Sequence, residues 1–161
     1  MNRLSKRPNV KLAFRKKDKL FEIFGLLFLL SYWLVILATY YTLPDSIPTH
    51  YNAIGGVDNY GEKSKLLNLP VWATILYLII TAFSSVPQYF NYLEKITYEN
   101  AEKEYRKAVN TFRFLKILVV ACYLTISIYS TQLTQHANYN LIIAALPYIL
   151  LMPTFYYLSK K

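Results

Sequence analysis

The sequence predicts an all-α integral membrane protein with four transmembrane helices and a small extracytoplasmic cap between the first two. Two observations lead to this fold class. The first is a set of four apolar runs, none with a charge in its middle, at about 21–42, 70–90, 112–131 and 139–158. A helix of about 20 residues is about 30 Å long, which matches the hydrocarbon core of a bilayer. The second observation is the distribution of positive charge.

The 18 Lys and Arg residues divide 16 to 2 between alternating segments of the chain. Sixteen lie before the first run, in or beside the second connection, or at the C-terminus. Only Lys63 and Lys65 lie in the first connection, and none lies in the third. The positive-inside rule therefore predicts cytoplasmic termini, a cytoplasmic 91–111 segment and outward loops at 43–69 and 132–138. We expect a multi-pass protein of the bacterial cytoplasmic (inner) membrane.

Residues 1–20 form a basic arm ahead of the membrane domain, which we place at 21–158. The net charge of +9 is also common in nucleic-acid-binding proteins. However, the arm lacks an interleaved stacking or groove-reading pattern, so no nucleic-acid partner is expected. We expect the arm at the anionic membrane surface. The run that follows is too long for a cleaved signal peptide and is interpreted as a retained anchor.

The outward loop 43–69 has the composition of a small hairpin cap. Its prolines fix φ and disfavour helix, so the chain should leave the first span in an extended form. The 49–51 segment is strand-like, the paired glycines supply a tight reversal, and the 58–61 segment is expected to supply another. We interpret five residues as structural: Pro44, Pro48, Gly55, Gly56 and Gly61.

The polar and aromatic side chains of this loop are the candidate contacts for a ligand or partner: His50, Asp45, Tyr51, Asn52, Asp58 and Lys63. His50 and the nearby acids could supply metal ligands, but no His-x-x-x-His or Cys spacing supports a metal site. We place a structural role for His50, satisfied by local backbone or a carboxylate, ahead of ligand contact and of metal binding. No metal and no cofactor are expected.

No catalytic constellation is recognisable in the sequence. There is no Gly-x-Ser-x-Gly or His-Glu-x-x-His motif, and the single cysteine, Cys122, lies in the third run. The spans also lack a central ionisable relay, because Glu22 and Lys116 lie near span ends and are expected to reach the headgroups. We therefore expect neither an enzyme nor an ion-coupled transporter.

The 91–111 segment is predicted to be a cytoplasmic helix that continues from the second span. Apolar residues from Tyr98 to Phe112 recur at spacings of three and four, and Glu102 precedes Arg106 by four. An amphipathic helix lying on the membrane or on its own bundle is favoured over a docking surface for a partner. Pro87 is expected to kink the second span, with Ser84 and Ser85 satisfying freed carbonyls.

The first connection carries a recurring set of landmarks: Leu43-Pro44, Ile47-Pro48, His50-Tyr51-Asn52, Gly55, Asp58, Gly61 and Lys63 or Lys65. With these residues, the first 90 or so positions resemble the domain of unknown function 1648 family of bacterial membrane proteins. The 100–106 and 114–116 segments resemble the region that follows this module in short four-span members. The best-known relatives are immunity proteins that protect a sporulating bacterium from a secreted killing peptide and sequester a repressor at the membrane.

These observations predict a non-enzymatic membrane protein whose outward loop recognises a peptide, lipid or partner protein, in an immunity-like or sensor-like role. The alternative is an accessory or structural subunit of a larger membrane complex. The expected partners are the lipid bilayer and either another membrane protein or a second copy of the chain.

Overall fold

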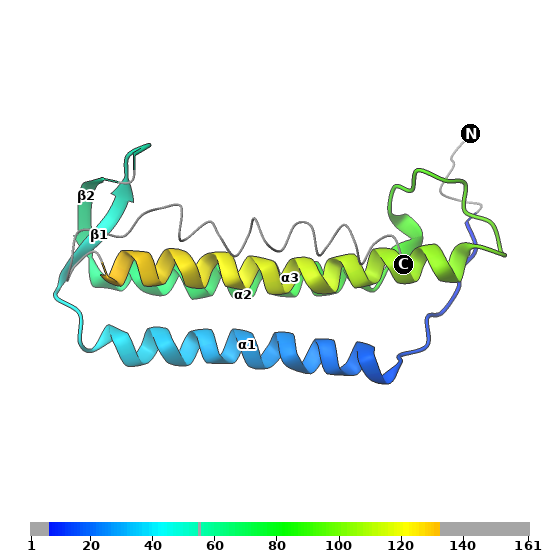
Figure 1. Cartoon of the computed structure of the whole chain (residues 1–161), viewed down its shortest axis with the longest axis horizontal. Coiled ribbons are helices and arrows are strands. Elements are labelled where there is room, and N and C mark those ends of the chain that lie inside the picture. Colours follow the sequence, from blue (N-terminus) through cyan, green and yellow to red (C-terminus); the bar gives the residue numbers. More distant parts are fainter. Residues whose placement is uncertain (1–6, 55, 133–161) are drawn as a thin grey trace.

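Three long helices and one small sheet make up the computed structural model, which describes residues 7–54 and 56–132 (Figure 1). The elements in chain order are α1 (Lys16–Tyr40), β1 (Ser46–Tyr51), β2 (Val57–Glu62), the 3-10 helix η2 (Lys63–Leu67), α2 (Asn68–Ser84), the 3-10 helix η3 (Pro87–Tyr89) and α3 (Ala101–Gln132). All three α-helices, α2 together with η2, are long and apolar enough to cross a membrane. This confirms a mostly helical membrane protein. The fourth predicted span, at about 139–158, lies outside the described residues.

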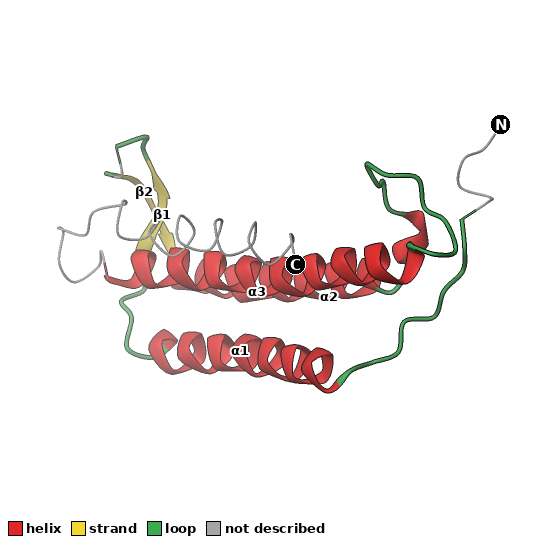
Figure 2. Cartoon of the chain, turned by 45° about the vertical axis from the view of Figure 1, so that its right-hand side comes forward, coloured by secondary structure: helices red, strands yellow, loops and turns green. Residues whose placement is uncertain are grey.

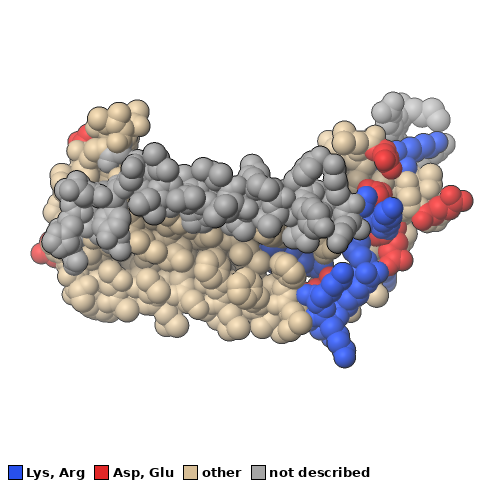
Figure 3. Space-filling view, viewed as in Figure 1, with Lys and Arg blue, Asp and Glu red and all other residues tan. Residues whose placement is uncertain are grey.

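The three helices lie side by side and the two ends of the molecule differ in composition (Figures 1 and 3). At the hairpin end, β1 and β2 stand beside the end of α1, the start of α2 and the end of α3. At the basic end, most of the Lys and Arg side chains gather around the first turns of α1 and α3 (Figure 3). Figure 2 shows that the loops before α1 and α3 also lie at the basic end. Positive charge is therefore segregated along the helix axes.

A core of buried side chains joins the three helices. Leu29 and Ile36 of α1, Ala73 of α2 and Val120 of α3 belong to it. The hydroxyl of Tyr32 lies 2.7 Å from Ser127 Oγ, and the indole of Trp33 donates to Thr74 Oγ1 at 3.0 Å. In lipid an unpaired polar group is costly, so these bonds hold α1 against α3 and α2 respectively.

The second helix ends earlier than the sequence predicted. It stops at Ser84 and not near residue 90, and only the short η3 follows. Pro87 has no N–H to donate and disfavours the helical conformation of the residue before it, so the expected kink is a helix end. The hydroxyls of Ser84 and Ser85 both donate to Thr81 O, at 2.7 and 3.3 Å, as expected for carbonyls freed near a proline.

The predicted helix over 91–111 is wrong in its first half. Residues 90–100 form loops and turns, and α3 begins at Ala101 and continues without interruption into the third span. Asn100 explains the late start, because its side chain accepts a hydrogen bond from Thr97 N at 2.8 Å and donates one to Lys95 O at 3.0 Å. These bonds hold a turn where the helix was expected.

The expected apolar stripe packs against the N-terminal arm over part of its length. Ala101 and Tyr105 are fully buried, and Tyr105 donates a hydrogen bond to Pro8 O at 3.0 Å. Val10 and Leu12 pack against the same cluster. Tyr98, the first member of the predicted stripe, is exposed and precedes the helix. The described part of the arm therefore covers the first turns of α3.

Candidate functional site

The hairpin is anchored to the helices through β1. Ile47 and Pro48 are buried, and β1 pairs antiparallel with β2 in a register that matches Ile47 with Gly61. Tyr51 is the last residue of β1 and contacts α3. Its hydroxyl lies 2.9 Å from Ser130 Oγ, and the centre of its ring lies 5.2 Å from that of Tyr129. Burial raises the pKa of the Tyr51 phenol, which therefore stays protonated and able to donate. The predicted cap thus rests on the helix ends as a β-hairpin.

The structure pairs the predicted contact residues in two separate places. His50 Nδ1 contacts Asp58 Oδ1 across the hairpin at 2.5 Å, and both side chains are partly exposed. Lys63 Nζ contacts Asp45 Oδ1 at 3.0 Å, close to the base of the hairpin. Asp45 therefore pairs with Lys63 and not with His50. The six predicted residues do not converge on one pocket.

Asn52 is the turn-forming residue of the hairpin. Its Oδ1 accepts hydrogen bonds from the N–H groups of Ile54 and Gly56, at 3.1 and 2.8 Å. The sequence predicted a second reversal at 58–61, and this prediction is wrong. These residues belong to β2, because pairing with β1 satisfies their backbone better than a turn would.

The predicted structural residues lie in several settings. Pro44 is exposed before β1, whereas Pro48 is a buried member of that strand. Gly61 lies within β2, where an added Cβ would stand 2.9 Å from Lys65 Nζ and 3.0 Å from Thr49 Cγ2. At Gly56 an added Cβ would approach Asn52 Nδ2 to 2.9 Å. Close neighbours, and not a left-handed backbone, therefore favour glycine at both positions. Gly55 lies outside the described residues.

The outer face of the hairpin exposes large apolar side chains. Ile54 in the turn is 91% exposed and Tyr60 of β2 is 61% exposed. Each residue from Asp58 to Tyr60 is exposed, whereas Ile47 of β1 belongs to the core shared with the helices. Among residues 7–54 and 56–132, no group of three or more His, Cys, Asp and Glu side chains is placed to hold a metal ion. The chemistry available at this face is therefore apolar contact, hydrogen bonding and weak charge pairing.

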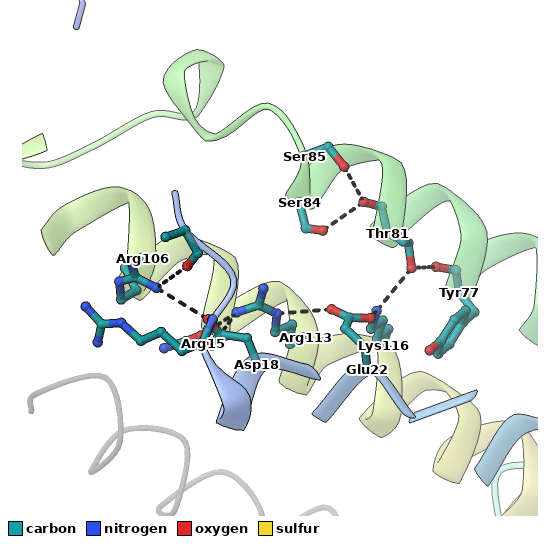
Figure 4. Close-up of polar contacts among 12 residues, drawn as sticks. Arg15, Asp18, Glu22, Tyr77, Thr81, Ser84, Ser85, Arg106, Arg113 and Lys116 are labelled. Carbon is teal, nitrogen blue, oxygen red and sulfur yellow. Dashed lines mark hydrogen bonds and ion pairs between the residues drawn. The ribbon is translucent and has the colours of Figure 1, made fainter. Parts of the chain in front are cut away.

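A second polar cluster, which sequence reasoning missed, lies at the basic end between the helices (Figure 4). We call it the buried ion network, and its members are Asp18 and Glu22 of α1, Arg106, Arg113 and Lys116 of α3, and Thr81 of α2. Asp18 accepts from Arg113 Nη1 at 2.9 Å and lies 3.4 Å from Arg106 Nη1. Because α1, α2 and α3 all contribute, the network fixes their relative positions.

Lys116 is the deepest charge of this network. Its side chain is 1% exposed, its Nζ donates to Glu22 Oε2 and to Thr81 Oγ1, and it lies 4.7 Å from the centre of the Tyr77 ring. Arg113 Nε also donates to Glu22, at 3.0 Å. The prediction that Lys116 reaches out to the headgroups is therefore wrong. The Glu22 carboxylate and the Thr81 hydroxyl take the place of water around the Lys116 ammonium group.

A helical spacing in the sequence would have revealed the network. Asp18 and Glu22 are four residues apart on α1, and positions 106, 110, 113 and 116 recur at three and four on α3. Such spacings place each set on one helix face. The acidic face of α1 meets the basic face of α3, and Asn110 adds a bond to Arg113 at 2.9 Å. Sequence reasoning interpreted the same positive charges only as an orientation signal.

Comparison with known proteins confirms the family resemblance over part of the chain. Residues 26–74 match the model of a domain of unknown function, DUF1648. An uncharacterized protein of Archaeoglobus fulgidus is 37% identical over 67 residues, and this match covers 37% of each of the two chains. No solved structure matches the chain. The matched segment contains the hairpin and all the predicted contact residues, whereas the buried ion network lies outside it.

Proposed function

We propose that this chain is a non-enzymatic membrane protein whose hairpin recognises an extended segment of another polypeptide outside the cytoplasm. The observation that carries the proposal is the two-sided hairpin. Its inner strand is fixed to α3 through Tyr51, while Ile54 and Tyr60 present exposed apolar surface on the other side. Large apolar side chains held on a rigid base are suited to binding, because little conformational freedom is lost on contact.

The free edge of β2 favours a peptide as the ligand. Within the described residues the sheet has only two strands, so β2 pairs with β1 along one edge and has no strand along the other. An unpaired edge offers backbone donors and acceptors to an incoming strand. Added strands gain affinity from these main-chain bonds and specificity from side-chain contacts, for which Ile54 and Tyr60 are available.

Helix α3 supports a sensor-like role because it touches both ends of the molecule. Ser130, near its last turn, contacts the hairpin, and Arg106 and Arg113, near its first turns, belong to the buried ion network. A displacement of the hairpin would therefore act on the same helix that organises the basic end. An immunity-like role, which the family resemblance of the sequence implies, belongs to this class of function.

The proposed topology has four spans in the bacterial cytoplasmic membrane, with both termini inside and the hairpin outside. The segregation of Lys and Arg at the basic end supports this orientation (Figure 3). Reporter fusions after residues 60 and 136 should give an external signal, and fusions after 100 and 161 a cytoplasmic one. An external signal at 100 would refute the orientation.

Site-specific photo-crosslinking tests recognition directly. A photoreactive phenylalanine analogue is placed at Tyr60 in living cells, and the matched control places it at Tyr98, which is 85% exposed at the opposite end. We expect a discrete polypeptide adduct at 60 that is absent at 98. The adduct should be lost when Asn59 is changed to Pro, because proline disrupts β2 and its edge. Equal labelling at both positions would refute the proposal.

The alternative, an accessory subunit of a larger membrane complex, is supported by the apolar surface of α1. Leu20 and Leu34 are 67% and 68% exposed, and either lipid or a partner helix would cover them. Purification in mild detergent separates the two functions. A second chain at fixed stoichiometry, retained when the hairpin adduct is abolished, would favour the subunit.

A further inference from the structure

A charged pocket lies at the basic end beside the buried ion network. It has a volume of about 720 Å³ and lies between the first turns of α1 and α3. Six of its lining residues are Lys or Arg and three are Asp or Glu, so the lining carries a net charge of about +3. Arg106 forms part of the pocket wall and also belongs to the buried ion network. A ligand in the pocket would therefore contact a residue that also pairs α3 with α1.

One donor of the pocket wall has no acceptor among the residues that the structure describes. Arg106 Nη1 donates to Ala13 O at 3.3 Å and lies 3.4 Å from Asp18, and Nη2 donates to Glu102 at 2.9 Å. Its Nε is buried and forms no hydrogen bond with any described residue. A buried charged donor without an acceptor is unfavourable, and an oxygen supplied from the pocket would satisfy it.

The unpaired Nε belongs to the edge of the guanidinium that binds two oxygens at once. In arginine, Nε and Nη2 point in parallel, and this pair of donors matches two oxygens of a phosphate. At present Nη2 is held by one oxygen of Glu102, whose side chain is 59% exposed. Glu102 makes one bond to this edge and leaves Nε unsatisfied, whereas a phosphate that places one oxygen at Nε and another at Nη2 would make two and displace the carboxylate. Lys17 and Lys103, both exposed, add positive charge to the pocket lining.

We propose that this pocket binds a phosphate group carried by an anionic lipid, with the Nε and Nη2 edge of Arg106 as its bidentate donor. Phe21 and Phe114 line the same pocket and supply apolar surface beside the charged groups. Phe21 is 44% exposed and starts the apolar stretch of α1, where an acyl chain would lie. A soluble phosphate compound shares the headgroup chemistry but makes no use of these rings.

Calorimetric titration of the full-length chain in non-ionic detergent tests the ligand class. The probes are short-chain phosphatidylglycerol, phosphatidylcholine with the same acyl chains, and inorganic phosphate. We expect phosphatidylglycerol to bind about tenfold more tightly than phosphatidylcholine, which corresponds to 1.4 kcal/mol. Inorganic phosphate that binds as tightly as the lipid would overturn the lipid source. Equal binding of the two lipids would overturn the proposal that the ligand is an anionic lipid.

Four variants locate the binding. Arg106→Gln and Lys103→Gln should each weaken phosphatidylglycerol binding, whereas Glu102→Gln should strengthen it by removing the competing carboxylate. The matched control is Lys11→Gln, which removes the same charge from an exposed residue outside the pocket. If Arg106→Gln does not fold, the opposite effects expected for Lys103 and Glu102 still test the site. Equal weakening by Lys11→Gln and Lys103→Gln would show attraction by net charge alone and overturn the proposal.

Discussion

The two ends of the molecule use ion pairs in opposite ways. At the hairpin end, His50 pairs with Asp58 with both side chains substantially exposed, and Asp45 remains 98% exposed beside Lys63. At the basic end, Asp18 and Arg113 pair with only 3% and 7% of their side chains exposed. Water screens the first pairs and is excluded from the second. Burial, and not the number of ion pairs, therefore separates charges that stabilise the fold from charges that remain available to contact a partner.

The difference extends to what holds each end in place. The hairpin rests on apolar residues of β1 and on the bond between Tyr51 and Ser130, so its charged side chains are free to change partners. At the basic end, the charges themselves join α1, α2 and α3. We therefore expect mutations of charge to act on stability at the basic end and on recognition at the hairpin end.

The largest effect should come from Asp18→Ala. This change leaves Arg106 and Arg113 buried without their shared carboxylate, and removing one partner of a buried pair costs about 3–5 kcal/mol. The free energy of unfolding in mixed micelles measures it. The matched control is Asp45→Ala, the same substitution at the exposed pair, which should stay within about 0.5 kcal/mol of wild type. Equal losses at both ends would contradict the comparison.

Gly25→Val should have the next largest effect. A Cβ at Gly25 would stand 3.0 Å from the Tyr77 hydroxyl and 3.5 Å from Ile117 Cγ1, where α1 approaches both other helices. Overpacking of such a contact costs about 1–3 kcal/mol. Gly56→Val is the control at the hairpin end, where displacing the side chain of Asn52 would break only two exposed hydrogen bonds of the turn. Thermal unfolding of the two variants should differ clearly, and a larger loss at Gly56 would count against the packing seen here.

Tyr51→Phe should loosen the hairpin and leave the basic end unchanged. It removes the hydroxyl bond to Ser130 while retaining the ring contact with Tyr129, so we expect a loss of about 0.5–1.5 kcal/mol. Hydrogen exchange should quicken in residues 46–62 and stay unchanged near Asp18. Faster exchange at both ends would show that the hairpin is coupled to the buried ion network.

Among the four variants, controls aside, the smallest effect on stability is expected for His50→Ala. Its side chain is 67% exposed and its partner Asp58 is 43% exposed, and such pairs contribute about 0.2–1 kcal/mol. A loss this small leaves the protein folded, so adduct formation at Tyr60 can be compared with wild type. Unfolding and crosslinking measured on the same sample separate structure from recognition. A loss above about 2 kcal/mol would show that His50 supports the hairpin.

Much of the hairpin could be predicted because local chemistry dictates it. Pro44 and Pro48 exclude helix, and a glycine pair between two extended segments indicates a reversal. The assignment of a turn to 58–61 failed for a physical reason. Asp and Asn favour turns only when no better backbone partner is present, and pairing with β1 supplies one.

The sequence alone was enough to predict a membrane protein, the segregation of its positive charge and a cap between the first two spans. These properties follow from run length, hydropathy and turn residues, all of which act within about 20 residues of chain. Which charges are buried depends on how the helices pack. Asp18 and Arg113 are separated by 95 residues and meet because the core around Tyr32 and Val120 sets which faces of α1 and α3 are opposed. Helix packing fixes that choice through the combined shape of many side chains, which no local pattern contains.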